Sequence, residues 1–88
     1  MGNADNFFSK LSKADKMFYE LGYEKTEKSH LITYSRYCTK ENDFENIHFF
    51  LENKGIKTNW DSYSSKFINV KEYLAINEKV KELGWINE

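Results

Sequence analysis

The apolar positions at the N-terminal end of the chain recur every three or four residues. This spacing is typical of a helix that buries one stripe of its surface. Ser12 precedes Asp15 by three positions and can cap the helix, so we expect the helix to begin near Ser12, after a separate short turn. Its stripe consists of Phe7, Phe8, Leu11, Ala14, Phe18 and Leu21.

From residue 23 onward the period changes to two, which is typical of β-strands. Residues 23–38 form two short runs that the polar sequence TEKS divides, and this pattern predicts a hairpin. Residues 45–52 continue the alternation, with Ile47 and Phe49 on the same face of the predicted strand. The middle of the chain is therefore predicted to form an antiparallel sheet.

The sequence NKG follows the third strand and is typical of a tight hairpin turn. We expect Gly55 to take the left-handed conformation there, and residues 56–60 to return as a fourth strand. Residues 61–68 are mostly polar and predict a loop that contacts the sheet edge at Phe67 and Ile68.

The C-terminal part of the chain returns to helical spacing. Asn69 is followed three positions later by Glu72, which is close to the capping-box pattern that starts helices. The predicted buried stripe of this second helix consists of Val70, Tyr73, Leu74, Ile76, Val80 and Leu83.

The phrase Glu-Leu-Gly-aromatic occurs twice, at residues 20–23 and 82–85. In each copy a glycine can end a helix in the left-handed conformation, and the ring after it, Tyr23 or Trp85, can fold back on the last turn. The segments before the two copies do not otherwise match, so we interpret the phrase as a helix terminator and not as an internal repeat.

The predicted order of elements is α-β-β-β-β-α. Short connections favour pairing between strands that are consecutive in sequence, which gives an antiparallel meander. Both helices can bury their stripes if they pack on one face of that sheet. We therefore expect an α+β fold in a single domain spanning residues 1–88, with the opposite face open to solvent or to a partner.

Composition narrows the cellular setting. Cys38 is the only cysteine, which argues against a disulfide-stabilised secreted domain and favours a reducing cytoplasm. The chain contains no apolar run of signal-peptide or membrane-spanning length, so no membrane association is expected. The net charge is −1, without the basic excess that is typical of proteins binding duplex DNA.

Candidate chemistry is sparse. Cys38, His30 and His48 could ligate a metal or form a nucleophile pair, but they lack the short paired spacing of zinc sites and a third orienting group. The acidic sequence KENDFEN lacks the glycine and the terminal glutamate of a calcium loop. We expect no enzyme activity, no metal and no cofactor.

Aromatic residues make up 17% of the chain and are its most unusual feature. Rings on an uncovered sheet face would serve as contact anchors, so we predict a non-catalytic interaction protein that binds a protein partner or a second copy of itself. The predicted partner-binding residues are Tyr37, Phe50, Trp60 and Tyr63.

A single-stranded nucleic-acid-binding domain is the alternative. Tyr34 or Tyr37, together with Phe50, Trp60 and Tyr63, would then stack on bases. The phosphates would lie near Arg36, Lys57 and Lys66. The near-zero net charge makes this the less favoured function.

Two groups of positions match a pattern that is found in other proteins: Phe18, Leu21, Gly22 and Tyr23, and Ala75, Ile76, Lys79, Glu82, Leu83, Gly84 and Trp85. At these positions the chain resembles a loose set of small uncharacterised proteins from phages, prophages and mobile elements of low-GC Gram-positive bacteria. That resemblance implies the fold and a phage or mobile-element setting, in which a host protein would be the partner. It implies no site residues, and the segment DSYSSKF departs from the pattern.

Overall fold

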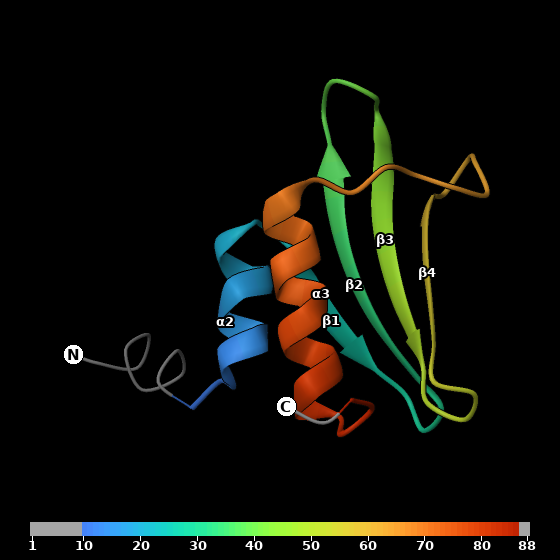
Figure 1. The fold of residues 1–88 in the computed structure, drawn as a ribbon. Helices are drawn as coiled ribbons and strands as arrows, with labels where there is room; N and C mark the ends of the chain where they lie inside the picture. The colour runs from blue at the N-terminus through green and yellow to red at the C-terminus, as the bar shows by residue number, and fades with distance from the viewer. Residues whose placement is uncertain (1–9, 87–88) are drawn as a thin grey trace.

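A computed structural model, which describes residues 10–86, confirms the α+β fold. The four strands form one antiparallel sheet in the order β1-β2-β3-β4, and both helices lie on the same side of it (Figure 1). The elements are α2 (Lys13–Glu20), β1 (Glu24–Glu27), β2 (Leu31–Cys38), β3 (Asp43–Phe50), β4 (Gly55–Trp60) and α3 (Val70–Glu82).

Both helices begin where the sequence predicts. Ser12 caps α2, because its hydroxyl accepts a hydrogen bond from the backbone N–H of Asp15 at 3.1 Å. Asn69 and Glu72 form a complete capping box at the start of α3, each side chain accepting from the other residue's backbone N–H. The predicted stripe residues Phe7 and Phe8 lie outside the described residues.

Both helices also end as predicted, in Schellman motifs. Gly22 and Gly84 have φ angles of +94° and +75°. The backbone N–H of Tyr23 donates to the carbonyl of Phe18, and that of Trp85 to the carbonyl of Val80, at 3.0 and 3.1 Å. Tyr23 is fully buried, and Trp85 is half-buried against the core. The repeated phrase is therefore a helix terminator in both places.

Arg36 of β2 explains why the first terminator also needs a small residue. A Cβ atom at Gly22 would lie 3.3 Å from the Arg36 Cδ. The guanidinium of Arg36 lies over the Tyr23 ring and donates to the carbonyl of Leu21 at 2.6 Å. Arg36 thus ties the end of α2 to the middle of the sheet.

Phe18 lies at the centre of the core. Its ring stacks on Tyr34 with centroids 3.9 Å apart, and it meets Tyr23 and Phe49 edge to face. Aromatic rings therefore supply much of the buried area, as the composition predicts. The core residues are Phe18, Tyr23, Ile32, Tyr34, Ile47, Phe49, Ala75 and Ile76.

The predicted buried stripe of α3 is wrong at three positions. Val70, Tyr73 and Leu74 are exposed. The buried positions instead include Glu72 and Lys79, whose charges are paired inside the protein. Because charged residues are seldom fully buried unless paired, apolar periodicity alone misses these two positions, although the predicted Ile76, Val80 and Leu83 do pack on the core. The buried residues of α3 are Glu72, Ala75, Ile76 and Lys79.

Two smaller predictions on the β4 side are also wrong. The left-handed residue of the β3–β4 turn is Lys54, with φ of 55°, because Gly55 already pairs with Phe50 in the sheet. Residues 61–69 form a loop as predicted, yet the Phe67 side chain is 96% exposed and does not pack on the sheet edge. The loop crosses one end of the sheet before it enters α3 (Figure 1).

Candidate protein-binding surface

The structure divides the four predicted partner-binding residues between the two sides of the sheet. Tyr37 and Phe50 lie on the face of the sheet that points away from the helices, which we call the open side; the other face is the helix side. Tyr37 pairs with Phe44 near one end of β3, and Phe50 lies at the other end. Six residue steps separate Phe44 from Phe50, or about 20 Å along a strand. Trp60 pairs with Glu45, a residue of the helix side. Only part of the predicted set can therefore contact one partner surface.

The middle of the open side is polar. Hydrogen bonds join Thr33 to His48 at 2.9 Å and Ser35 to Asn46 at 2.8 Å, across the β2–β3 pair. Asn46 also donates to Asp61 at 2.7 Å. The open side is therefore not a continuous aromatic platform, and its exposed rings stand at its two ends.

Trp60 and Tyr63 are the two predicted residues that do come together. The backbone N–H of each donates to the carbonyl of the other, at 3.1 and 3.2 Å, in the turn that follows β4. Both line a hollow of about 530 Å³, together with Ser65, Lys66 and Phe67. The Tyr63 and Phe67 side chains are 70% and 96% exposed. This hollow places three rings within one contact area.

We call Trp60, Tyr63, Phe67 and Ile68 the loop surface. Ile68 joins it because it lines a neighbouring hollow of about 270 Å³ together with Trp60 and Phe67. Sequence reasoning missed Phe67 and Ile68, because an apolar pair after a polar loop is normally interpreted as a packing contact. Their isolation between the polar loop and the capping residue Asn69 is the one signal that could have marked them.

Lys66 attaches this loop to the body of the protein. Its side chain is only 5% exposed, and its ammonium lies 3.2 Å from Glu45 and 3.3 Å from Glu72. It also donates to the carbonyl of Phe67 at 2.6 Å. The Thr58 hydroxyl of β4 donates to the carbonyl of Lys66 at 2.9 Å. The exposed Phe67 ring therefore directly follows a residue whose side chain is held in place by two ion pairs.

Lys66 belongs to a buried network of two acids and two bases. Arg36 donates two hydrogen bonds to Glu45, at 3.0 and 2.9 Å, and one to Glu72 at 2.8 Å. The Tyr23 hydroxyl donates to Glu72 at 2.8 Å. Burial raises the pKa of Glu45, but the hydrogen bonds and charges of Arg36 and Lys66 outweigh burial and place this pKa below its usual 4.5. The Glu45 carboxyl therefore stays ionised inside this network.

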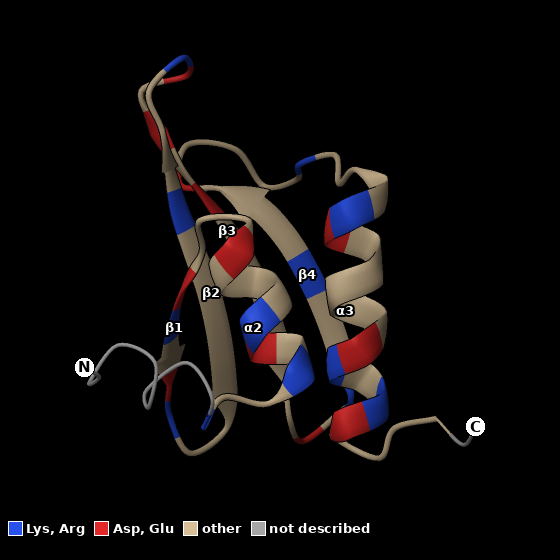
Figure 2. Ribbon diagram, turned by 90° about the vertical axis from the view of Figure 1, so that its left-hand side faces the viewer, with Lys and Arg blue, Asp and Glu red and all other residues tan. Residues whose placement is uncertain are grey.

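This pairing bears on the nucleic-acid alternative. Arg36 and Lys66, which that alternative assigns to phosphates, are both engaged with buried carboxylates. Tyr34 is fully buried and does not offer its ring for stacking. Figure 2 shows charges of both signs along α2 and α3, instead of a basic stripe. Of the three predicted phosphate contacts, Lys57 alone is exposed on a strand.

A second buried network surrounds Asp15 of α2. Lys25 contacts the Asp15 carboxylate at 2.7 Å and Lys79 contacts it at 3.4 Å, while the Tyr34 hydroxyl donates a hydrogen bond to it. Burial raises the pKa of Asp15, but these bonds and charges outweigh burial and lower this pKa below its usual 3.8. Lys79 is also paired with Glu82 at 2.8 Å. This network joins α2, α3 and the β1–β2 pair.

Acid should therefore destabilise the fold through Asp15 and Glu45. Both carboxyls have pKa values lowered in the folded state, so the unfolded chain binds more protons as the pH falls below about 4.5. Their contribution to stability is present above that pH and is lost as the pH falls through the folded-state pKa values. Urea unfolding at pH 7, 4, 3 and 2 should show this decline, and Asp15→Asn should make it shallower. An unchanged pH dependence in Asp15→Asn would contradict the assignment.

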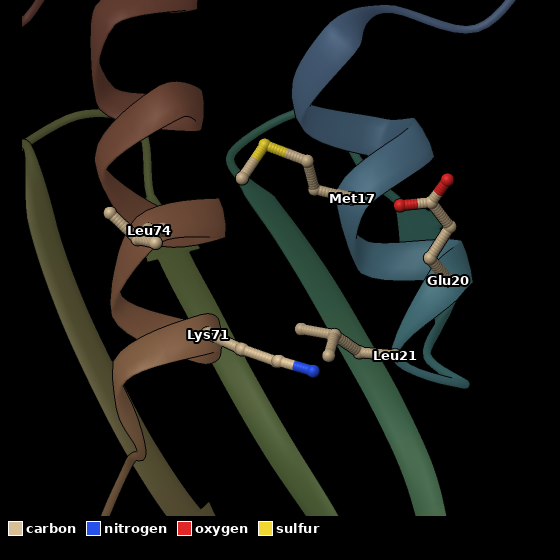
Figure 3. Close-up of a pocket in the computed structure, with 5 residues that line it drawn as sticks. All are labelled: Met17, Glu20, Leu21, Lys71 and Leu74. Atoms are coloured by element: carbon tan, nitrogen blue, oxygen red, sulfur yellow. The ribbon is translucent and has the colours of Figure 1, made fainter.

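A third hollow, of about 250 Å³, lies between α2 and α3 and is lined by Met17, Glu20, Leu21, Lys71 and Leu74. Figure 3 shows Lys71 extending from α3 toward Leu21 of α2. The lining is mainly apolar, with one acid and one base. It contains none of the four predicted partner-binding residues and shares no residue with the loop surface.

None of the candidate metal and nucleophile residues lines the two hollows of the loop surface. His48 is on the open side of β3, and His30 precedes β2 and lies 3.1 Å from Glu52. Cys38 ends β2 as a half-exposed free thiol. Within residues 10–86, no group of three or more His, Cys, Asp or Glu side chains is arranged to hold a metal ion.

Neither α2 nor α3 combines the length and apolar character that crossing a membrane requires, and the same holds for the rest of the described residues. Comparisons of the chain with protein-family models, with curated proteins and with solved structures find no match.

Proposed function

We propose that this protein is a small non-catalytic interaction protein that binds a protein partner through the loop surface. In line with the resemblance described above, we further propose a phage or mobile-element origin, a host protein as the partner and the cytoplasm as the place where they meet. The single observation that carries the proposal is the exposure of Phe67 beside Lys66, since an exposed ring follows directly on a buried, charge-paired residue.

The energetics of contact favour such an arrangement. Interface anchors are commonly aromatic residues that fill a pocket on the partner. A ring held in place before binding loses less conformational freedom when the complex forms. The four bonds of Lys66 and the turn between Trp60 and Tyr63 limit the freedom of the loop before Phe67, and the capping box at the start of α3 fixes the chain after it. The loop surface is thus organised before the partner arrives.

Alanine replacement tests this proposal. The double variant Tyr63→Ala/Phe67→Ala should weaken partner binding by about 30-fold or more, because the loss of even one anchor of this kind costs about 2 kcal/mol or more. Because both side chains are exposed, the free energy of unfolding should change little. Capture from a nuclease-treated lysate of a low-GC Gram-positive bacterium, followed by titration with the captured protein, gives the measurement.

Tyr37→Ala/Phe44→Ala is the matched control, because it removes the same two residue types from the open side. The control should bind as the unaltered chain does. Loss of binding in the control alone would move the interface to the open side. Capture that nuclease abolishes, with steep salt dependence, would instead favour the single-stranded nucleic-acid alternative.

A further inference from the structure

The two edges of the sheet differ in how they are protected. β1 and β4 are the outer strands, and each has one edge that pairs with no other strand. On β1 the side chain of Lys25 is paired with Asp15 and Glu27, and α2 lies beside this strand. Charged side chains and covering elements are common means of blocking an edge. β4 forms the opposite edge of the sheet from β1, and α3 lies beside it on the helix-covered face (Figure 2).

The hydrogen-bond pattern shows which groups of β4 face outward. The backbone N–H of Asp61 donates to the carbonyl of Phe44, and this bond fixes the alternation along the β3–β4 pair. In an antiparallel ladder, alternate residues bond to the neighbouring strand. Asn59, Lys57 and Gly55 therefore bond to β3. The backbone groups of Ile56, Thr58 and Trp60 point away from it.

Trp60 uses its outward backbone groups in the turn with Tyr63. The outward backbone N–H and C=O groups of Ile56 and Thr58 stay available for pairing, since no other segment within residues 10–86 hydrogen-bonds to them. We call these two N–H and two C=O groups the β4 edge. They can bond to about three residues of an added extended strand.

The side chains beside the β4 edge define what such a strand should carry. Ile56 is 43% exposed and lies on the helix side. Thr58 lies on the same side, between Ile56 and the loop. Lys57 points to the open side and is exposed. An added strand would place one side chain beside Lys57 and its two neighbours beside Ile56 and Thr58. Opposite charges and apolar or β-branched pairs are the favourable cross-strand combinations.

A second copy of this chain fits the β4 edge poorly. The two-fold pairing that satisfies all four groups places Ile56 opposite Thr58 of the other copy and the two Lys57 side chains directly opposite each other. Like charges in that position are destabilising. Of the two neighbouring registers, one places Ile56 opposite Trp60 of the other copy, whose backbone groups are already bonded within the turn. The other places Thr58 opposite Lys54, which lies in the turn before β4 and has a left-handed backbone.

We propose that the β4 edge binds an extended segment of the protein partner, with an acidic residue beside Lys57 and an apolar or β-branched residue on each side of it. The partner would add a fifth strand to the sheet. This inference rests on the proposed function, because the added strand runs alongside β4 toward Trp60 of the loop surface.

A short peptide tests the pairing without the natural partner. The probe is acetyl-Thr-Val-Glu-Val-Thr-amide, and its control carries Lys in place of Glu. In the free 88-residue protein the amides of Ile56 and Thr58 should exchange with solvent faster than those of Lys57 and Asn59. The Glu peptide should shift and protect the Ile56 and Thr58 amides, and the Lys peptide should bind about 3- to 10-fold more weakly.

Thr58→Pro and Thr58→Val are the matched variants. Both lose the hydroxyl bond to Lys66, but only proline also loses the outward N–H, a change that an edge strand tolerates. Thr58→Val should bind the Glu peptide and the captured partner, whereas Thr58→Pro should lose at least 10-fold in affinity for both. If Thr58→Pro does not unfold cooperatively, the exchange experiment on the unaltered chain decides.

Several outcomes would overturn the inference. One is that the Glu peptide neither shifts nor protects the Ile56 and Thr58 amides. Another is that the two Thr58 variants bind the peptide equally. A third is that self-association protects these amides in the absence of peptide. Partner binding that needs Phe67 but survives Thr58→Pro would leave the proposed function standing and remove the β4 edge from it. Failure of the unaltered chain to capture any protein would count against the proposed function, while the peptide would still report on the β4 edge.

Discussion

Replacing Phe18 with alanine should lower the free energy of unfolding by about 3–5 kcal/mol. Phe18 has no exposed surface and contacts three other rings, one by stacking and two by their edges. Alanine would leave a cavity beneath Tyr34 and Tyr23, both of which are also fixed by hydrogen bonds to buried carboxylates. These rings cannot easily move to fill the space, so most of the cavity should persist.

This loss is large for a domain of this size. The free energy of unfolding of a native protein is about 5–15 kcal/mol in total, so Phe18→Ala should leave a marginally stable fold with a greatly reduced urea midpoint. Phe44→Ala is the matched control, since it removes the same side chain from the open side, where Phe44 is exposed and touches Tyr37 edge to face. The control should lose no more than about 1.5 kcal/mol, the contribution of one aromatic pair. Equal losses in the two variants would contradict the assignment of Phe18 to the core.

Local chemistry explains which parts of the fold are predictable from the sequence. A capping residue, a left-handed glycine and the ring behind it are decided within a few positions, so the sequence places both ends of α2 and α3 correctly. Strand alternation is equally local, and it separates Tyr34 on the helix side from Thr33 on the open side. The meander then follows from the short connections.

The parts that the sequence does not predict depend on contacts between distant segments. Glu72 and Lys79 replace apolar residues in the buried stripe of α3, because Arg36, Lys66 and Asp15 meet them there from other elements. No period in the helix itself reveals those partners.

The candidate site shows the same limit. Tyr37, Phe50, Trp60 and Tyr63 form one group on grounds of composition, whereas strand direction and register send them to different places. Phe67 is exposed although buried contacts of its neighbour Lys66 hold the loop against β3, β4 and α3. Lys66 is held by Glu45 of β3 and Glu72 of α3, and the sequence of the loop itself does not reveal these two partners.

Glu72→Gln should lower the free energy of unfolding by about 3–5 kcal/mol, the usual cost of removing one partner from a buried ion pair. The Glu72 side chain is 2% exposed and accepts hydrogen bonds from Tyr23, Arg36, Lys66 and the backbone of Asn69. Glutamine keeps the shape and one oxygen for the capping box, but its amide nitrogen cannot accept the hydrogen bonds from Tyr23 and Arg36, so the change removes the charge together with these two contacts. Glu45 would then be the only carboxylate paired with both Arg36 and Lys66.

Glu78→Gln is the matched control on the same helix. Its carboxylate is more exposed, and its contacts with Lys13 and Lys81 are long, at 3.8 and 3.9 Å. Ion pairs of this kind contribute about 0–1 kcal/mol, so the control should unfold nearly as the unaltered chain does. Urea unfolding of both variants provides the comparison. A loss below 1 kcal/mol in Glu72→Gln would show that the network does not hold β2, β3, the loop and α3 together, and that Phe67 owes its position to other contacts.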